Sequence, residues 1–365
     1  MIKSLKTFIS NQRKLFYFAN GLVKHYQTGI KKSKIKVIRE LCKWIIKERS
    51  FNNMYYAFGL NIAGTKQREF IGKNEFLNIK AKVEREMKSR AANNHNYDVI
   101  TKDKFYANSV LTANGIDCIE NLAVIHNSMV YYNNGMKEEL ESILQLKYPT
   151  FIKNTVMEAG TGLLECEVSG SDFLINGEQS SLEELKKRLG SKTWIIQRKQ
   201  KAHTEIRKIN ATALNTTRIV TIYDGRDPVY LTGFQSLATG SATTDSWDKG
   251  SIYVGIDPER NSLKKYGYYN PWVENKSRVT EHPDSAIEFA GYKISDLQRA
   301  VKLCIKAHSI LFFNFIIGWD VALTEEGPRI LEANEKPGMN AVQCLDGGLR
   351  YKIMEIAENC LKSKL

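Results

Sequence analysis

Two acidic side chains and one amide near the end of the chain have the types and spacing of a site for a divalent cation. Two apolar runs flank a turn-rich break at residues 324–328, and this pattern predicts a β-hairpin. If the hairpin folds about Glu326, Asp320 lies opposite Glu332, and strand alternation puts Asn334 on the same face. Facing carboxylates repel unless a cation lies between them, and Mg²⁺ prefers such oxygen ligands. A solvent-facing hairpin with ordinary surface acids is the alternative. We expect the apolar side chains to point to the other face, namely Trp319, Val321, Leu331 and Ala333.

The same residues carry a resemblance to a known family. Asp320, then Glu332 and Asn334 on the next predicted strand, then Pro337 and Gly338, resemble the metal-binding hairpin of ATP-grasp enzymes. In that superfamily an acid on one late strand and a Glu-x-Asn on the next hold the Mg²⁺ ions that bridge the phosphates of ATP. The resemblance implies ATP and Mg²⁺ as cofactors, with Mn²⁺ as a substitute metal. It also implies that Asp320, Glu332 and Asn334 are the metal ligands.

Basic and glycine-rich elements upstream follow the order of the same family. Lys104, directly after Asp103 at the start of a predicted helix, is similar to the lysine at the entry to the ATP-grasp core. Lys153 is similar to the family's strand lysine, and the loop after it to the phosphate loop, which implies that Gly160, Thr161 and Gly162 bind phosphate. An ammonium group offsets phosphate charge, and glycines let backbone N–H groups approach phosphate oxygens. A helix lysine or an isolated Gly-x-Gly without any phosphate is the alternative.

The strand predicted at residues 194–197 resembles the hinge strand whose backbone binds adenine in ATP-grasp enzymes. The resemblance places Ile196, Gln197 and Arg198 at the adenine. Many relatives have an acid where Gln197 stands, but an amide can both donate and accept a hydrogen bond. His203 follows soon after, and we expect it to reach the ribose or the substrate. A structural or exposed histidine is the alternative.

The strand predicted at residues 217–223 carries the most family-specific match. Asn215 and Arg218 resemble the Asn-x-x-Arg strand of the ATP-grasp branch associated with sugar transfer and surface-polysaccharide biosynthesis, which is related to α-L-glutamate ligase-like proteins. The resemblance implies that both residues bind the nucleotide and that Arg218 and Lys153 are catalytic. A guanidinium suits the transferring phosphate because it donates two parallel hydrogen bonds. Residues 244–257 and 282–284 also resemble that branch, and we expect them to shape the acceptor pocket.

The elements that must position these residues form a helical region followed by mixed strands and helices. Residues 1–95 are expected to be mostly helical, with a helix at 74–92 and a polar boundary at 93–96. Residues 236–250 are predicted to be a long loop. Beyond residue 97 the predicted strands lie at 123–125, 129–132, 150–153, 163–168, 194–197, 217–223 and 229–234, and the predicted helices at 103–113, 136–146, 181–189, 295–309 and 349–362.

This pattern favours an α+β fold, and the resemblance implies that it is of the ATP-grasp type, in which two α/β subdomains clamp ATP. The expected division is a helical basic N-terminal region at 1–96, an N-terminal ATP-grasp subdomain at 97–196 and a catalytic C-terminal subdomain at 197–365.

The positive charge of the chain is concentrated at its N-terminus. Residues 1–50 contain 13 Lys and Arg against two acids, whereas the other residues carry 40 basic and 38 acidic groups. This local excess disfavours nucleic-acid binding by the whole chain. It favours either a solvated helical face or contact with an anionic membrane or an acidic polymer through residues 1–50. The six scattered cysteines and the lack of a long apolar run predict a cytoplasmic protein, with the inner face of the membrane as an alternative place.

The interpretation that joins these motifs is an ATP-dependent ligase that forms a carbon–nitrogen bond through an acyl phosphate. The family branch implies a small-molecule or saccharide carboxylate and an amine as substrates, such as a uronic acid or an amino acid on a capsule or other surface-polysaccharide precursor. Two alternatives stay open. One is an ATP-grasp kinase that phosphorylates a different acceptor. The other is a non-catalytic protein that binds an anionic surface or nucleic acid through its basic N-terminus.

Overall fold

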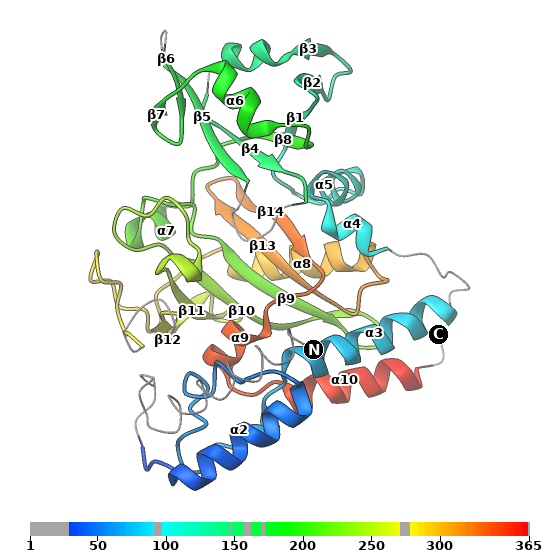
Figure 1. The fold of residues 1–365 in the computed structure, drawn as a ribbon, viewed down its shortest axis with the longest axis vertical. Helices are drawn as coiled ribbons and strands as arrows, with labels where there is room; N and C mark the ends of the chain where they lie inside the picture. The colour runs from blue at the N-terminus through cyan, green and yellow to red at the C-terminus, as the bar shows by residue number, and fades with distance from the viewer. Residues whose placement is uncertain are drawn as a thin grey trace, which may run out of the picture.

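The computed structural model describes residues 29–90, 97–146, 148–156, 162–169, 172–270 and 278–363. These residues form two antiparallel sheets, one within residues 121–198 and the other within residues 217–334. Figure 1 shows the first sheet in a lobe that stands above a larger body built on the second sheet. Strands and helices mix in both parts, so the predicted α+β class is confirmed.

The upper lobe contains an eight-stranded sheet in the order β3-β2-β1-β8-β4-β5-β6-β7. Its strands are β1 (Asn121–His126), β2 (Met129–Tyr132), β3 (Lys137–Glu139), β4 (Thr150–Asn154), β5 (Leu163–Ser169), β6 (Asp172–Ile175), β7 (Glu178–Gln179) and β8 (Trp194–Arg198). Helix α6 (Leu182–Leu189) packs on this sheet, because Leu185 and Leu189 join a buried cluster with Ile125 and Ile152. Ser181 caps this helix and accepts a hydrogen bond from the Glu184 N–H at 3.2 Å.

One predicted helix of this lobe is wrong. Residues 136–146 form β3 followed by the 3₁₀ helix η2 (Leu140–Gln145). Residues 137–139 pair with β2 as an antiparallel edge strand, and this pairing overrides the helical preference of the sequence.

The larger body contains a six-stranded sheet in the order β12-β11-β10-β9-β13-β14. Its strands are β9 (Thr217–Tyr223), β10 (Pro228–Leu237), β11 (Ile252–Asp257), β12 (Ser262–Tyr268), β13 (Ile316–Thr324) and β14 (Gly327–Asn334). One face carries α8 (Leu297–Ile310), which packs on Ile219 and Ile317. The opposite face carries α3 (Lys73–Arg90), α9 (Met339–Asp346) and α10 (Arg350–Lys362), which pack on Val220 and Ile316. Adjacent strand residues thus enter different cores, and helices cover both faces.

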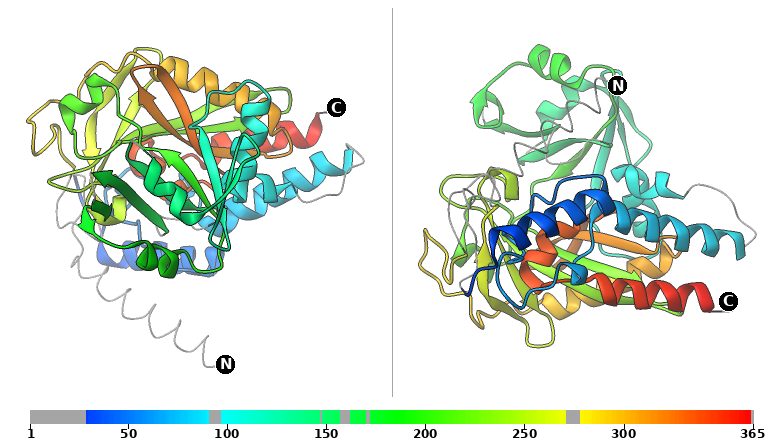
Figure 2. Two further views of the ribbon diagram at one scale, coloured as in Figure 1. Left: turned by 90° about the horizontal axis from the view of Figure 1, so that it is seen from above. Right: turned by 60° about the horizontal axis from the view of Figure 1, so that its bottom comes forward.

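The N-terminal part of the described chain packs on the underside of this body. Figure 2 shows α2 (Lys34–Glu48) lying next to α9 there. Its buried side joins a cluster that includes Tyr268 of β12 and Cys344 of α9. Glu48 lies at the start of α3 and accepts hydrogen bonds from the N–H groups of Asn74 and Glu75 at 2.9 and 3.2 Å.

The expectation of a mostly helical N-terminus holds for α2 and α3 but not between them. Residues 49–72 form turns and the short η1 (Gln67–Glu69), with Gly59 and Gly64 in left-handed conformations. The helical expectation for residues 1–28 lies outside the described residues.

Short elements connect these layers. They are α4 (Asp98–Lys102), α5 (Lys104–Ala113), α7 (Thr204–Ile209) and η3 (Trp247–Lys249). The loop expected at residues 236–250 begins after β10 ends at Leu237 and contains η3. Among the helices of the described residues, we find none with the length and apolar character needed to cross a bilayer.

Candidate active site

Three neighbouring strands of the six-stranded sheet bring one basic and two acidic side chains into a row. Arg218 on β9 lies opposite Asp320 on β13, and Asp320 lies opposite Glu332 on β14. Asn334 follows two residues after Glu332 and donates a hydrogen bond from Nδ2 to Asp320 Oδ2 at 3.3 Å. The facing arrangement of Asp320 and Glu332 that the spacing predicted is therefore present.

The hairpin itself differs from the prediction in one detail. Its turn is centred between residues 325 and 326 rather than on Glu326. A β-bulge at Leu331 shifts the register by one residue, and this shift brings Glu332 opposite Asp320. Leu331 lines the same hollow as the two acids, so the expectation that it points away from them was wrong. The other three apolar residues are buried in the opposite core as predicted, namely Trp319, Val321 and Ala333.

Cationic side chains are paired with both acids. Arg218 donates to the two carboxylate oxygens of Asp320, from Nε at 2.6 Å and from Nη2 at 3.1 Å. Nζ of Lys104 lies 3.7 Å from Oε1 of Glu332. Asp103 caps α5 by accepting hydrogen bonds from the first turn, and this cap fixes the position of the neighbouring Lys104. Lys104 therefore reaches the acids from a helix, whereas the other charged groups lie on strands.

Burial and charge shift pKa values at this position. Burial raises the pKa of Glu332, the charge of Asp320 raises it further, and the neighbouring cations act against both. Burial also lowers the pKa of Lys153 to about 8, with Lys104 adding to the lowering and the two acids opposing it. An added cation beside Glu332 and an added anion beside Lys153 would both relieve the cost of ionisation. The charge pattern thus suits a ligand that combines a metal cation with phosphate.

The oxygen donors present fit Mg²⁺. Within the described ranges, no three His, Cys, Asp or Glu side chains come together as a metal site of protein ligands alone. Mg²⁺ bound with a nucleotide needs only one or two carboxylates, because phosphate oxygens and waters complete its octahedral shell. Asp320 and Glu332 supply two carboxylates on facing strands, and Asn334 adds an amide beside them. Burial and then the charge of Asp320 raise the pKa of Glu332, and a bound cation would oppose both effects.

A cleft of about 550 Å³ extends from this row of charges between the two sheets. A smaller hollow of about 170 Å³ at its end adds Lys104, Asp320 and Glu332 to the lining. The two spaces are continuous because they share five lining residues, namely Lys153, Gln197, Thr216, Asp245 and Leu331. The larger space has the size range of sites for small ligands and cofactors.

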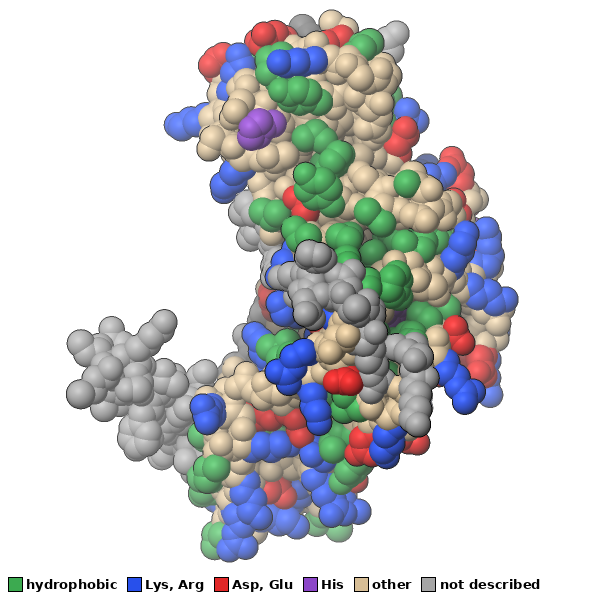
Figure 3. Space-filling view, turned by 90° about the vertical axis from the view of Figure 1, so that its right-hand side faces the viewer, with side chains coloured by type: hydrophobic (Ala, Val, Ile, Leu, Met, Phe, Trp, Pro, Cys, Tyr) green, Lys and Arg blue, Asp and Glu red, His purple; other side chains and the backbone are tan. Residues whose placement is uncertain are grey.

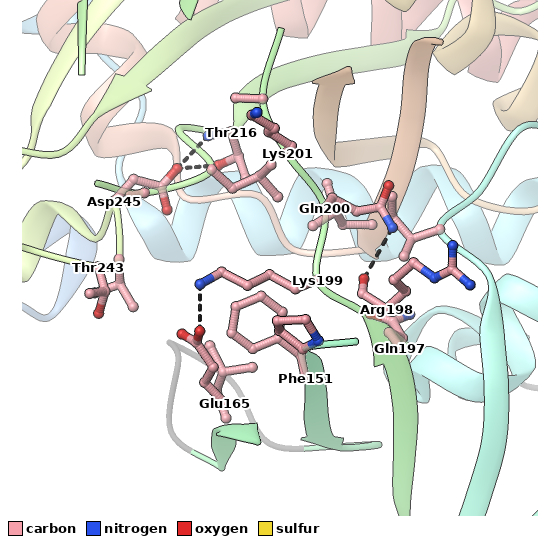
Figure 4. Close-up of a pocket in the computed structure, with 18 of the residues that line it drawn as sticks. Phe151, Glu165, Gln197, Arg198, Lys199, Gln200, Lys201, Thr216, Thr243 and Asp245 are labelled. Carbon is pink, nitrogen blue, oxygen red and sulfur yellow. Dashed lines mark hydrogen bonds and ion pairs between the residues drawn. The ribbon is translucent and has the colours of Figure 1, made fainter. Parts of the chain in front are cut away.

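The end of the cleft away from the acids has apolar walls. Phe151 of β4 and Leu163 of β5 line it, and Figure 4 shows Phe151 beneath the segment that leaves β8. The guanidinium of Arg198 lies 4.0 Å from the ring centroid of Tyr148. Lys199 forms an ion pair with Glu165 across this end of the space, as Figure 4 also shows. A flat apolar ligand would therefore have an aromatic wall and a charged rim.

Gln197 is buried at the boundary between the apolar and charged ends. Its Nε2 donates to Asn121 Oδ1 at 2.8 Å, whereas its Oε1 has no hydrogen-bond partner among the described residues. A buried acceptor without a partner is costly, so a ligand that donates a hydrogen bond here would be stabilised.

Ile196 and His203, two of the residues expected at the nucleotide, do not line the cleft, and neither does the side chain of Arg218. The side chain of Ile196 lies in the core of the upper lobe, and its backbone is paired with β1 and β4 on both sides. His203 caps α7, where Nδ1 accepts from the Glu205 N–H at 3.3 Å and Nε2 lies 3.4 Å from Glu325. Neither side chain lines the cleft, because β8 points Gln197 rather than Ile196 at it and because Glu205 and Glu325 lie beside His203. The expected backbone contact of Ile196 with adenine and the expected contact of His203 with the ribose or substrate stay predictions.

Asn215 is a buried structural residue rather than a ligand-lining one. It has a left-handed φ of 53° and donates to the carbonyl oxygens of Asn210 and Ala213 at 2.9 and 3.0 Å. Its Oδ1 accepts from the Ala238 N–H at 2.7 Å. These bonds fix the turn before β9, and so Asn215 positions Arg218 without lining the cleft. Its expected contact with the nucleotide stays a prediction.

The predicted phosphate loop is only partly described. Gly160 and Thr161 lie outside the described residues. Gly162 has a φ of 76°, and its carbonyl oxygen accepts a hydrogen bond from the Asn154 N–H at 2.9 Å. Lys153, the neighbour of Asn154, lines both parts of the cleft.

Thr216 is a lining residue that the sequence interpretation did not single out, and Asp245 entered it only as part of the segment 244–257 expected at the acceptor pocket. Asp245 accepts hydrogen bonds from the N–H and Oγ1 of Thr216 at 2.5 and 2.7 Å, as Figure 4 shows. Burial raises the pKa of Asp245, although these hydrogen bonds act in the opposite direction. The sequence signals were the Gly- and Ser-rich loop that contains Asp245 and the place of Thr216 between Asn215 and Arg218.

The segment at 282–284 supports this loop from outside the cleft. His282 is buried with Nε2 at 2.8 Å from the Ala238 carbonyl oxygen, and Asp284 accepts from the Gly240 N–H at 2.6 Å. Neither side chain lines the cleft, so this segment shapes the pocket only through the loop.

Comparison with known proteins gives one family and several structural similarities. The model of the sugar-transfer associated ATP-grasp family matches residues 83–358. No curated protein sequence matches the chain.

Solved structures with a similar arrangement include three ligases or synthetases. A D-alanine-D-alanine ligase from Coxiella burnetii is 10% identical with a TM-score of 0.40, over 71% of this chain and 57% of that one. An N5-carboxyaminoimidazole ribonucleotide synthetase is 13% identical with a TM-score of 0.38, over 66% and 46%. An L-amino acid ligase from Bacillus licheniformis is 13% identical with a TM-score of 0.38, over 67% and 42%. The matched part of this chain thus spans about half the length of these three proteins.

Proposed function

Because the chain belongs to the sugar-transfer associated ATP-grasp family, we propose that it is an ATP-dependent ligase that joins a carboxylate to an amine through an acyl phosphate. The observation that carries the proposal is the facing pair of acids Asp320 and Glu332, with Arg218 bound to Asp320, in a hollow that opens into a cleft large enough for a nucleotide. We further propose that ATP lies between the subdomains at 97–196 and 197–365, which follow an N-terminal region at 1–96.

The two ends of the cleft would bind the two ends of ATP. Phe151 and Leu163 would pack on the base, and the unpaired Oε1 of Gln197 would accept a hydrogen bond from its amino group. Lys153 and Lys104 would neutralise phosphate charge at the other end. Asp320, Glu332 and Asn334 would hold Mg²⁺. The bound metal would supply positive charge that stabilises the negative charge on the phosphate oxygens.

The reaction needs no nucleophile from the protein. An oxygen of the substrate carboxylate attacks the γ-phosphorus of ATP, and the bond from that phosphorus to the bridging oxygen breaks to release ADP. An amine then attacks the acyl carbon, loses a proton, and expels inorganic phosphate to leave an amide. The protein's part is to position the reactants and to stabilise charge on the transferring group. Arg218 lies in the same row as the acids and is our candidate for holding that group.

Support for the substrate class comes from the family rather than from the cleft. Its description as sugar-transfer associated supports a carboxylate carried on a saccharide, such as a uronic acid or an amino acid attached to a surface-polysaccharide precursor. A reaction that consumes ATP also needs the nucleotide pool of the cytoplasm, and we place the protein there.

Oxygen-18 transfer tests this chemistry directly. The full chain is incubated with ATP, Mg²⁺, an amine and a candidate carboxylate labelled with oxygen-18, and the products are analysed by mass spectrometry. A ligase of the proposed type moves one labelled oxygen into inorganic phosphate, because the carboxylate oxygen leaves with the phosphoryl group. Label in AMP, or a stable phosphorylated product with no release of phosphate, would contradict the proposal and favour an adenylating enzyme or a kinase.

A further inference from the structure

The outward side of α2 exposes isoleucines at both ends of one helical stripe. Ile35 and Ile46 are 73% and 80% exposed, and Ile30 just before the helix is 82% exposed. Ile35, Arg39, Lys43 and Ile46 are spaced by four, four and three residues, which keeps them on one face of a helix. Ile35 and Ile46 are therefore about 16 Å apart along the axis. We call the exposed set the α2 basic face, and it consists of Ile35, Lys36, Arg39, Lys43 and Ile46.

The opposite side of the same helix is fully used in packing. Val37, Leu41 and Trp44 are buried in a cluster with aromatic residues of segment 51–70 and with Tyr268 of β12. The helix is thus fixed to the body by one side. The isoleucines on the other side are not part of any core cluster of the described chain.

The charge of this surface has one sign. Six exposed basic residues on this face or near it have no ion-pair partner in the described part of the chain, namely Lys31, Lys34, Lys36, Arg39, Lys43 and Arg49, whereas Lys47 of the same helix is paired with Glu75 at 2.6 Å. The two acids of α2 are occupied elsewhere. Glu40 binds Lys32 at 3.0 Å and the Tyr55 hydroxyl at 2.6 Å, and Glu48 binds the start of α3. Figure 3 shows Lys and Arg side chains with hydrophobic ones between them in the lowest part of the molecule, at the level of α2 in Figure 1.

We propose that the α2 basic face docks on an anionic lipid bilayer, with its isoleucines at the interface and its basic side chains against the headgroups. A helix that combines exposed apolar side chains with Lys and Arg has the chemistry of interfacial binding. Basic residues near an anionic leaflet add attraction that acts over about a Debye length. The preceding sequence has the same character, because residues 1–28 contain five Lys and Arg and no Asp or Glu.

Two other occupants fit the same face less well. A second copy of the chain would bring like charges together, since the α2 basic face contains three cations and no acid. A soluble acidic polymer would account for the cations but would leave Ile35 and Ile46 exposed to water. A bilayer satisfies both features at once.

Vesicle binding by the full chain tests the proposal. The protein is sedimented with vesicles of phosphatidylcholine, with or without phosphatidylglycerol. The charge variant carries Lys36→Glu, Arg39→Glu and Lys43→Glu, and we expect its binding to anionic vesicles to fall about 100-fold, at roughly fivefold for each basic group. The apolar variant carries Ile35→Ser and Ile46→Ser, and we expect a fall of about tenfold because interfacial apolar contact is lost.

The matched control reverses three exposed lysines elsewhere, namely Lys187, Lys208 and Lys302, each replaced by Glu. It changes the net charge by the same amount as the charge variant, and we expect it to bind like the wild type. If the control loses as much binding as the charge variant, overall charge drives binding, and that result overturns the proposal. Urea unfolding of every variant shows whether the fold is kept.

Three further results would also overturn it. In the first, the wild type binds neutral and anionic vesicles equally well, or binds neither kind of vesicle. The apolar variant could keep full binding while the charge variant loses it, which is the behaviour of a site for an acidic polymer. Sedimentation velocity could show a dimer that the serine substitutions dissociate, which would assign the face to a second copy.

Discussion

Replacing the two facing acids one at a time should separate stability from turnover. Asp320 accepts both hydrogen bonds from Arg218, and the two side chains are 22% and 24% exposed. Removing one partner of a fully buried pair costs about 3–5 kcal/mol, whereas an exposed pair contributes about 0–1 kcal/mol. For this partly exposed pair we expect Asp320→Asn to lower the free energy of unfolding by about 1–3 kcal/mol.

Glu332→Gln should have the opposite or no effect on stability. Its cationic neighbour Lys104 is 3.7 Å away, which is longer than a normal hydrogen bond. Burial and the charge of Asp320 both disfavour the ionised form of Glu332. Loss of its charge removes a repulsion across the strand pair, so the free energy of unfolding should stay the same or rise by up to about 1 kcal/mol.

Turnover should fall in both variants, because each replaces one of the two carboxylates that we propose as metal ligands. We expect a loss of at least about 100-fold in the rate of ADP release, the scale of removing one electrostatic contact to a transferring group. Urea unfolding followed by tryptophan fluorescence gives the stabilities, and a coupled assay for ADP gives the rates. Equal destabilisation by Glu332→Gln and Asp320→Asn, or wild-type turnover in either variant, would contradict these roles of the two acids.

Three further predictions concern residues outside the row of charges. Asn215→Ala should lower the free energy of unfolding by about 2–4 kcal/mol in urea titrations, because alanine is strained at a φ of 53° and several backbone groups lose their partner; an unchanged stability would contradict its structural role. His203→Ala should leave the KM for ATP close to that of the wild type in steady-state kinetics, because Glu205 and Glu325 hold the ring outside the cleft, and a large rise in KM would place it back at the nucleotide. Burial lowers the pKa of His308 to about 4, although a hydrogen bond with the Asn314 carbonyl acts in the opposite direction. The pKa in an unfolded chain is near 6.5, so the folded protein binds fewer protons and loses stability as the pH falls. Between pH 7 and about 4.5 the wild type should lose about 2–3 kcal/mol more than His308→Gln in urea titrations, and equal losses would contradict the assignment.

The parts of the site that the sequence predicts well are local in the chain. Asp320 and Glu332 belong to one hairpin, and strand alternation with a short turn is enough to place them face to face. Strand bounds such as those of β2 and β9 follow in the same way from apolar runs between turns. The helix after Asp103 is also local, because its cap lies in the sequence beside it.

The parts that the sequence does not give depend on contacts between distant segments or on a local irregularity. The bulge at Leu331 adds one residue to a strand and turns an apolar side chain toward the cleft. Asp245 reaches the site through hydrogen bonds to Thr216, which is 29 residues earlier in the chain.

Asn215 shows a different limit. It carries the family's motif, yet its amide is fully engaged by backbone groups of its own turn and of Ala238. A motif identifies such a residue, but only the three-dimensional hydrogen bonds show that it acts by positioning its neighbours.

Crystallography with Mn²⁺ and a non-hydrolysable ATP analogue tests the central claim most directly, because the anomalous signal of manganese locates the metal without reference to activity. Our account predicts the metal between β13 and β14, with oxygen atoms of Asp320 and Glu332 in its coordination shell and the phosphates toward Lys153. Nucleotide bound in the cleft with the metal away from both carboxylates, or no nucleotide in the cleft, would contradict it.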